Sequence, residues 1–142
     1  MKIHGIGIDV VEVERIAATM EKPGEAFLTR VFTPAERDYC RSHARPAIHF
    51  AARFAAKEAV SKAFGTGIGQ HAGLLEIEIL NTPAGAPVVH LHGAAAAFAA
   101  AQGISQVLIS LTHTQQYAAA NAIAVGGAVQ YHSSSLNSDH SR

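Results

Sequence analysis

The chain has 142 residues, of which 49% are hydrophobic and 15% charged, and its formal net charge is zero. This composition excludes a disordered chain and indicates one globular domain with a sizeable core. Ten of the eleven Lys and Arg residues lie within residues 2–62, where eight acidic residues nearly balance them. Nucleic-acid-binding proteins usually show a basic excess, so we expect no nucleic-acid partner, whereas a small anionic ligand or a locally acidic protein fits.

The sequence shows neither a membrane-spanning segment nor a secretory signal. No apolar run is long enough to cross a bilayer, and the N-terminus enters a strand-like pattern directly, without a signal peptide. The single cysteine, Cys40, excludes an internal disulfide framework and suits a reducing cytosol. We therefore expect a cytoplasmic protein with no membrane association. Cys40 has no evident paired base, so a plain helix residue is the preferred interpretation over a nucleophile.

The first predicted element is a strand over residues 2–10, in which large apolar and small residues alternate. One face carries Ile6, Ile8 and Val10, and the other carries Gly5, Gly7 and Asp9. Glycine on the second face lets another backbone or a ligand approach closely. The alternation therefore predicts a close packing partner for this strand, ending at a carboxylate.

Helices are predicted next. Apolar residues at helical spacing indicate a helix over 13–20, which EKPGE ends, and a short helix follows around 26–31. Thr33, Pro34 and Glu36 are typical of a helix start, with the threonine as N-cap, and that helix runs to about residue 42. A long helix spans 47–64 and ends at a glycine-rich segment.

The remaining elements alternate between strands and turns. We expect strands over 75–79, 88–92, 106–114 and 117–125, a helix over 93–103, and turns at 81–87 and near 114–116. The fold class is α+β, an antiparallel sheet packed against one long helix. Residues 1–126 are expected to form a single domain, and residues 127–142 a disordered C-terminal tail.

The long helix contains RFAAKEAVSK at 53–62, with four charges on the segment best suited to burial. Alanines and other apolar residues cover one arc, and the opposite arc carries Arg53, Lys57, Glu58, Ser61 and Lys62, with Phe54 among them. We expect the first arc to pack on the sheet. The second arc is expected to line a groove.

Single residues of this group have ordinary explanations. Glu58 and Lys62 have the i,i+4 spacing of a surface ion pair worth about 0.3–0.5 kcal/mol, and Asp9 alone resembles a strand-end turn residue. Together with Arg53 and the strand-end pair His113-Thr114, however, they form a mixed-charge set on a weakly charged protein. Two carboxylates with several cations suit Mg²⁺ shared with the phosphates of a ligand.

Other site motifs are not satisfied. GTGIGQ lacks the Gly-Lys-Ser/Thr ending of a phosphate loop and follows a helix, so it is not a dinucleotide fingerprint either. The nine histidines offer no HExxH and no zinc-like Cys/His spacing, and His90 and His92 have no third ligand nearby. No G-x-S-x-G elbow of a serine hydrolase is present.

Five segments in order along residues 2–126 resemble the holo-acyl-carrier-protein synthases, the small bacterial 4′-phosphopantetheinyl transferases. They are GIGIDVVEVERI at 5–16, FTPAERDYC at 32–40, RFAAKEAVSKAFGTGIG at 53–69, EIEILNTPAGAP at 76–87 and LTHTQQYAAANAIA at 111–124. The G-x-D near the start and the F-x-x-K-E-x-x-x-K of the helix are highly specific together. Two departures are the late Thr112-His113-Thr114, where Ser-His-Thr is usual, and a first helix and loop poorer in arginine than in many relatives.

The resemblance implies Mg²⁺-dependent transfer of phosphopantetheine from coenzyme A to a serine of a carrier protein, releasing adenosine 3′,5′-bisphosphate, with Mn²⁺ as an alternative metal. Asp9 and Glu58 would hold the metal, Glu58 would take the serine proton directly or through a water, and Lys62 would stabilise the leaving phosphate. The other implied coenzyme A contacts, besides Lys62, are Arg53, Ser61, Gly65, His113 and Thr114. The implied acyl carrier protein contacts are Arg15, Lys22 and Arg30.

The resemblance also implies a homotrimer with active sites at the subunit boundaries. Two other functions remain open at this stage. One is a non-catalytic regulatory module that binds coenzyme A and forms no product. The other is an interaction or structural protein whose charged helix face is merely solvated.

Overall fold

The structure, a computed structural model, describes residues 1–22 and 26–127, so the tail predicted at 127–142 lies outside the described residues except for residue 127. The helices are α1 (Val13–Met20), α2 (Ala26–Val31), α3 (Pro34–Arg41), α4 (Pro46–Phe64), the 3₁₀ turn η1 (Leu74–Glu76) and α5 (Gly93–Ala101). The strands are β1 (Lys2–Glu12), β2 (Ile77–Asn81), β3 (Pro87–Leu91), β4 (Ile104–His113) and β5 (Tyr117–Gly126). The α+β class predicted from the sequence is confirmed.

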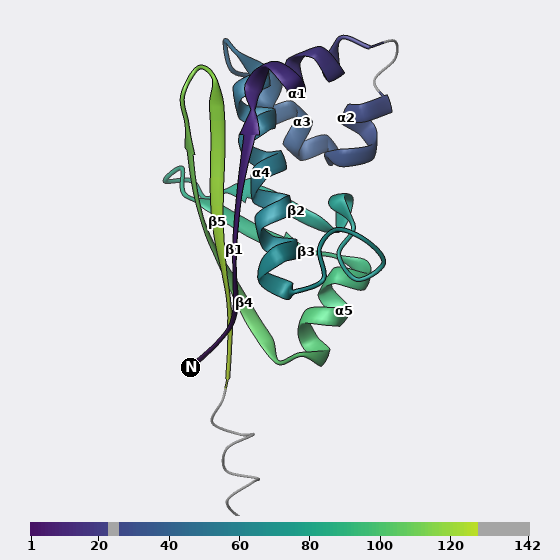
Figure 1. The fold of residues 1–142 in the computed structure, drawn as a ribbon, viewed down its shortest axis with the longest axis vertical. Helices are drawn as coiled ribbons and strands as arrows, with labels where there is room; N and C mark the ends of the chain where they lie inside the picture. The colour runs from purple at the N-terminus through teal and green to yellow at the C-terminus, as the bar shows by residue number, and fades with distance from the viewer. Residues whose placement is uncertain (23–25, 128–142) are drawn as a thin grey trace, which may run out of the picture.

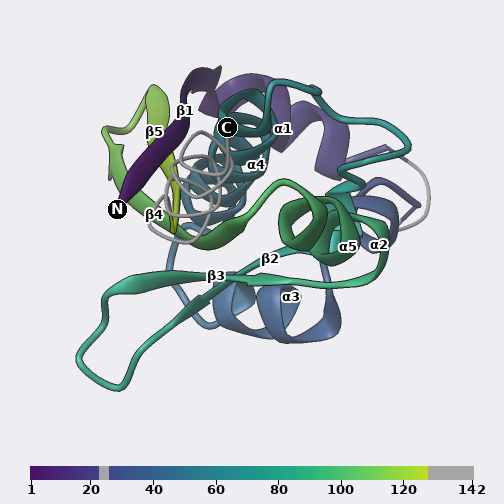
Figure 2. The ribbon, with the colours of Figure 1, turned by 90° about the horizontal axis from the view of Figure 1, so that it is seen from below.

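The strands form two antiparallel sheets rather than one. A long sheet has the order β1-β5-β4, and β2 and β3 form a separate hairpin. Helix α4 packs against β1 and β5, while α1, α2 and α3 gather at its N-terminal end (Figure 1). Viewed from below, the long sheet lies on one side of α4 and the β2–β3 hairpin on another (Figure 2). The central helix is therefore enclosed by most of the fold.

Glycines of β1 allow the backbone of α4 to touch the sheet. A Cβ atom built on Gly7 would lie 1.8 Å from the carbonyl oxygen of Ala59, and one built on Gly5 would lie 2.0 Å from that of Ala63. The neighbouring strand β5 contributes only methyl groups to the same layer, from the buried Ala118, Ala120, Ala122 and Ala124. The close approach expected from the alternation in β1 is thus present, and its partner is the helix.

The opposite face of the long sheet is uncovered. Ile6, Ile8 and Val10 of β1 are 67%, 66% and 61% exposed, and Leu108 of β4 is 45% exposed. Apolar side chains that are contiguous on an open sheet face typically mark an interaction surface. The alternation of β1 therefore separates a helix-packing face from an apolar outer face.

Most helix and strand boundaries agree with the prediction to within two residues. Thr33 caps α3, accepting a hydrogen bond from the Glu36 amide, while the Glu36 carboxylate accepts one from the Thr33 amide, which completes the predicted capping box. The strand expected from residue 75 begins only at Ile77. Glu76 explains this difference, because its carboxylate accepts hydrogen bonds from the amides of Gly73 and Ala94 and so closes the turn η1.

The expected division of α4 into a packing arc and a groove-lining arc is wrong. Arg53, Lys57 and Ser61 are buried together with the alanines, so that only part of the polar arc faces solvent. Arg53 and Lys57 are tolerated there because they meet hydrogen-bond partners on β2, η1 and α3, and Ser61 because it donates to a carbonyl oxygen of α4 itself. In the part of the chain that the structure describes, no helix combines the length and apolarity needed to span a membrane.

Replacing Gly7 with alanine tests the contact between β1 and α4. Because the new methyl group collides with helix backbone, which cannot yield locally, Gly7→Ala should lower the free energy of unfolding by about 2–3 kcal/mol or more. Urea denaturation measures the change. Gly69→Ala is the matched control, since a Cβ there meets nothing within 4 Å and should alter stability by less than about 0.5 kcal/mol. Equal effects of the two substitutions would contradict the packing argument.

Candidate active site

Asp9 and Lys62 are joined where β1 crosses α4. The Lys62 ammonium donates hydrogen bonds to the Asp9 carboxylate at 3.1 Å and to the carbonyl oxygen of Ile8 at 3.0 Å. The contact follows from the glycine packing, which brings this part of the helix close enough to the strand for a lysine to reach across. The Lys62 side chain is still 49% exposed. With two of its three N–H donors engaged, a third remains available to a ligand.

Glu58 lies one turn before Lys62 and shares a cavity of about 510 Å³ with Asp9. Burial raises the pKa of Glu58, the neighbouring Asp9 carboxylate raises it further, and Lys62 opposes these effects only in part. Two carboxylates thus line one cavity, and the lysine that is paired with Asp9 also acts on the charge of Glu58. This is an arrangement that a divalent cation would stabilise.

The donor set suits a hard cation. Among the described residues, no group of three or more His, Cys, Asp or Glu side chains could hold a metal ion. Two carboxylates alone fit Mg²⁺, which commonly binds one or two protein carboxylates and completes its octahedron with water and substrate phosphates. The residues therefore fit the predicted metal, provided that a ligand supplies further oxygens.

The walls of this first cavity are partly apolar. Ile16, Phe27 and Phe54 line it beside the carboxylates, and Arg15, a predicted carrier contact, lies on the same cavity. Phe27 and Phe54 are packed together with their ring centroids 6.3 Å apart. The aromatic ring noted on the charged arc of α4 therefore belongs to the wall of the cavity that contains Glu58.

Arg53 belongs to a second cavity of about 290 Å³, which His113 also lines. Its guanidinium carbon lies 3.9 Å from the centroid of the Tyr39 ring, and one guanidinium nitrogen donates a hydrogen bond to the Asn81 side chain. The residue is only 3% exposed, yet its Nε–H has no hydrogen-bond partner. A buried, clamped cation with an unused donor is suited to binding an anion.

The structure therefore divides the predicted site residues between two places. Asp9 and Glu58 line the first cavity, and Lys62 is held on Asp9, whereas Arg53 and His113 line the second. The two cavities share no lining residue. Within one chain these residues do not form the single mixed-charge group expected from the sequence.

Besides Lys62, three predicted coenzyme A contacts line neither cavity. Ser61 is fully buried and donates its hydroxyl to the carbonyl oxygen of Glu58 at 2.7 Å. Thr114 uses its hydroxyl oxygen to accept the amides of Gln116 and Tyr117 in the β4–β5 turn. Gly65 caps α4 with φ of 81°, a left-handed conformation for which glycine is favoured.

Two further predicted carrier contacts lie on the surface. Lys22 is exposed just beyond α1, and Arg30 is exposed on α2, where its Nε–H donates to the carbonyl oxygen of Ala26 at 3.0 Å. Neither residue lines the cavity that contains Glu58. Their positions leave both free to meet a protein partner, as predicted, without placing them at the reacting groups.

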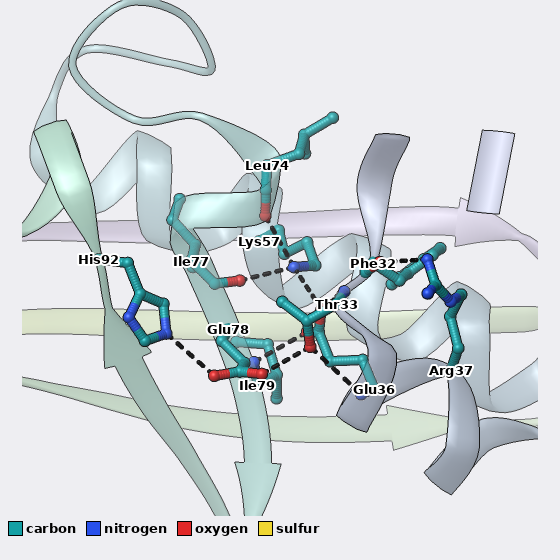
Figure 3. Close-up of polar contacts among 10 residues, drawn as sticks. All are labelled: Phe32, Thr33, Glu36, Arg37, Lys57, Leu74, Ile77, Glu78, Ile79 and His92. Carbon is teal, nitrogen blue, oxygen red and sulfur yellow. Dashed lines mark hydrogen bonds and ion pairs between the residues drawn. The ribbon is translucent and has the colours of Figure 1, made fainter. Parts of the chain in front are cut away.

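Lys57, the first lysine of the helix motif, lies inside the protein (Figure 3). Its ammonium and the Glu36 carboxylate are fully buried and 2.9 Å apart. Lys57 also donates to the carbonyl oxygens of Leu74 and Ile77, each at 2.7 Å. Burial lowers the pKa of Lys57, and Glu36 opposes that change. All three donors of the ammonium are thus satisfied by the protein, so Lys57 has a structural role.

Glu36 extends this network to the surface. Besides Lys57 it accepts the amides of Thr33 at 2.8 Å and Ile79 at 2.9 Å, and so joins α3 to β2. The Thr33 hydroxyl donates to Glu78, whose carboxylate contacts His92 at 2.9 Å (Figure 3). The network ties α3, α4, η1 and β2 together. Because Asn81 ends β2, the same ties place the hydrogen-bond partner of Arg53.

Sequence reasoning missed several residues of the two cavities. Tyr39 and Asn81 hold Arg53, and Phe27 contributes to the wall beside Glu58. Among the carboxylates of the buried network, Glu36 alone was marked by the sequence, because the threonine-to-glutamate spacing indicated a helix cap. That spacing could not reveal that the same carboxylate neutralises Lys57.

The chain is similar to known proteins of one family. A family model described as the 4′-phosphopantetheinyl transferase superfamily matches residues 5–122. A holo-[acyl-carrier-protein] synthase of Desulforudis audaxviator is 52% identical over 87% of this chain and 94% of its own length. A crystal structure of the synthase from Neisseria meningitidis has a TM-score of 0.81 at 35% identity, covering 87% of this chain and 99% of that one.

A third relative is described with a ligand. The Helicobacter pylori holo-[acyl-carrier-protein] synthase, in complex with coenzyme A, has a TM-score of 0.76 at 31% identity, covering 84% of this chain and 99% of that chain. The family match spans most of the described residues, and the resemblance stated from the sequence is confirmed. The chain belongs to the 4′-phosphopantetheinyl transferase superfamily.

Replacing Lys57 tests the buried network. Lys57→Met leaves the Glu36 carboxylate buried without a cation, so it should lower the free energy of unfolding by about 3–5 kcal/mol. The double variant Lys57→Met/Glu36→Gln should recover part of this loss, because an amide at position 36 needs no counter-ion. Chemical denaturation of both variants, with the exposed-site variant Lys2→Met as control, measures the coupling. A loss below about 1 kcal/mol for Lys57→Met would contradict the structural role.

Proposed function

We propose that this protein is a holo-acyl-carrier-protein synthase. It transfers 4′-phosphopantetheine from coenzyme A to a serine hydroxyl of an apo-acyl carrier protein and releases adenosine 3′,5′-bisphosphate in a Mg²⁺-dependent reaction. The observation that carries the proposal is the cavity shared by Asp9 and Glu58, with Lys62 paired to Asp9 at 3.1 Å, in a chain of this family. The buried free thiol of Cys40 is compatible with the reducing cytoplasm, where we place the reaction.

Asp9 and Glu58 are the residues that would hold the metal. When bound, Mg²⁺ supplies positive charge that neutralises the pyrophosphate oxygens and polarises the phosphorus for attack. The support for this assignment is the pair of carboxylates at one cavity, together with the effect of Asp9 on the pKa of Glu58. Mn²⁺ has the same preference for oxygen ligands and is the alternative metal.

Glu58 accepts the proton in the reaction, and Lys62 stabilises the charge that develops on the leaving group. The serine oxygen forms a bond to the β-phosphorus of coenzyme A, the bond from that phosphorus to the bridging oxygen breaks, and the serine proton passes to Glu58. A carboxylate with a raised pKa is better matched to accept a proton near neutral pH. The remaining N–H donor of Lys62 stabilises the negative charge on the departing phosphate.

The nucleotide end of coenzyme A would bind at the second cavity. Arg53 and His113 are the residues there that suit phosphate oxygens, and the unpartnered Nε–H of Arg53 supports the assignment. Thr114 would act from the adjoining turn. Gly65 would act from the C-terminal end of α4, and the fully buried Ser61 would act only indirectly, through its hydrogen bond to the carbonyl oxygen of Glu58.

Carrier docking is assigned to basic residues of the N-terminal helices. Arg15 lies on the cavity that contains Glu58, where a carrier would have to present its serine, and the exposed Lys22 and Arg30 extend the basic surface outward. An acidic carrier surface would be attracted to these side chains.

We propose a homotrimer in which each complete site is made by two chains. Two observations support this. The apolar outer face of the long sheet, with Ile6, Ile8 and Val10, is uncovered in the isolated chain. The reacting residues and the nucleotide-binding residues occupy separate cavities, so a second copy packed on the open sheet would bring the second cavity of one chain beside the first cavity of the next.

Substitution of the reacting residues tests the proposed chemistry. Glu58→Gln should reduce transfer by about 10²- to 10⁴-fold because the proton acceptor is lost, and Lys62→Ala should reduce it by about 10²- to 10³-fold. Mass spectrometry of an apo-carrier incubated with coenzyme A and Mg²⁺ detects the added phosphopantetheine. Asp38→Asn, an exposed carboxylate of α3, should retain activity.

The same variants separate chemistry from binding. Mg²⁺ with coenzyme A should raise the melting temperature of the wild-type protein and of Asp38→Asn by mass action, and should raise that of Glu58→Gln less. Full turnover in both Glu58→Gln and Lys62→Ala would refute the assigned roles. Coenzyme A binding without any product in the wild-type protein would instead indicate a non-catalytic binding module.

Mixing two inactive variants tests whether sites are shared between chains. Glu58→Gln damages the first cavity and Arg53→Gln the second. Trimers co-refolded from equal amounts should regain about a quarter of the wild-type activity, because about a quarter of the boundaries combine an unchanged first cavity with an unchanged second cavity. Each variant refolded alone is the control. Activity no higher than the mean of the two controls would show that one chain holds the whole site.

A further inference from the structure

Three imidazole rings gather at one end of the second cavity. His43 and His49 are stacked, with ring centroids 3.8 Å apart and planes inclined by 27°. His113 meets the edge of His49, with centroids 5.4 Å apart. The rings come from three separate segments: the connection after α3, the second turn of α4 and the end of β4. Tertiary packing, rather than local sequence, therefore creates the cluster.

The groups that face His49 are cationic or neutral. Tyr39 faces it from α3, His43 from the α3–α4 connection, Arg53 from α4 and His113 from β4. Strand β2 contributes the neutral amide of Asn81, and no carboxylate is among the described residues that line the cavity. Without an anion, these neighbours oppose a positive charge on His49. An anion in the cavity would not be fully neutralised by the charges already present.

The position of His43 makes it a fixed support. Its Nδ1 lies 2.8 Å from the carbonyl oxygen of Tyr39, to which only a protonated Nδ1 can donate. That hydrogen bond fixes the orientation of the ring against which His49 is stacked. His49, in contrast, lines the cavity directly. The two rings therefore differ in function, one holding the stack in place and the other facing the ligand.

His49 is neutral in the empty cavity at physiological pH. Burial lowers its pKa to about 4, and His43, His113 and Arg53 contribute to the change. Introduction of an opposite charge within hydrogen-bonding distance favours the protonated form by about one to three pH units. Binding of a phosphate in the cavity would therefore be linked to proton uptake from solvent, because the phosphate favours the charged form of His49 in the complex.

We propose that His49, supported by His43, is a specificity-determining residue that takes up a proton from solvent, to a greater extent as the pH falls below neutral, when the 3′-phosphate of coenzyme A enters the second cavity. This inference rests on the proposed function, since it takes coenzyme A as the ligand. The protonated ring adds a charge-assisted hydrogen bond beside Arg53. This bond is formed only with a nucleotide that carries the 3′-phosphate. The cavity thus distinguishes coenzyme A from 3′-dephospho-coenzyme A.

Calorimetry on the intact protein with Mg²⁺ tests the proposal. Coenzyme A and 3′-dephospho-coenzyme A are titrated between pH 5.5 and 8 in pairs of buffers with different ionisation enthalpies, which counts the protons bound. Wild type should take up protons with coenzyme A beyond those that accompany 3′-dephospho-coenzyme A. For a pKa rise of about two units, the ratio of wild-type to His49→Gln affinity for coenzyme A should increase about fourfold from pH 8 to pH 5.5.

The comparison with His49→Gln removes the effect of the phosphate itself, which also gains a proton near pH 6. His90→Gln, on the exposed surface of β3, is the matched control and should behave as wild type. His43→Gln should weaken the affinity for coenzyme A at pH 5.5, because the ring against which His49 is stacked is lost. An unchanged affinity and proton count in a folded His43→Gln variant would overturn the supporting role of His43.

Each outcome separates this inference from the function on which it rests. Tight binding of coenzyme A with a proton count that is unchanged in His49→Gln would overturn the role of His49 and leave the transferase function intact. Proton-linked binding without transfer to a carrier would support the role of His49 and overturn the function. Failure of coenzyme A to bind at any pH would overturn both.

Discussion

The contact between the backbone of α4 and the glycines of β1 is the constraint on which the rest of the structure depends. Gly5 and Gly7 leave no side chain between strand and helix, so the carbonyl oxygens of Ala59 and Ala63 lie directly against the strand. At this separation Lys62 reaches both the Asp9 carboxylate and the carbonyl oxygen of Ile8. Any larger side chain on that face of β1 would move the two groups apart, so the same packing that stabilises the fold also sets the geometry of its reacting groups.

A second constraint acts on the other side of the same helix. The buried pair of Lys57 and Glu36 costs desolvation, and its value lies in the hydrogen bonds that it makes to η1, β2 and α3. Lys57 and Lys62 thus have opposite roles although they are five residues apart in one motif. Rotation around the helix axis explains the difference, since one lysine points into the protein and the other toward the edge of the first cavity.

The sequence was sufficient where local rules decide the outcome. The alternation of β1, the capping box at Thr33 and the glycine after Phe64 each predicted an element boundary or a packing face that the structure confirms. It was insufficient where partners come from distant segments. Arg53 and Lys57 looked exposed because charged residues usually are. The groups that make their burial possible, such as Asn81 and the carbonyl oxygen of Ile77, lie 28 and 20 residues away along the chain and follow no fixed spacing.

Composition and site chemistry are connected through the position of the basic residues. Residues 63–141 contain neither lysine nor arginine, so the polar side chains that β2 and β4 contribute to the second cavity are the uncharged Asn81 and Ser110 and the imidazole of His113. Among the described residues that line this cavity, Arg53 is consequently the one permanent cation. Further positive charge beside a phosphate must come from imidazoles, and an imidazole that is surrounded by other cations becomes charged only when the anion is present. A chain with this distribution of charge can bind a phosphate without storing a large uncompensated positive charge in the empty site.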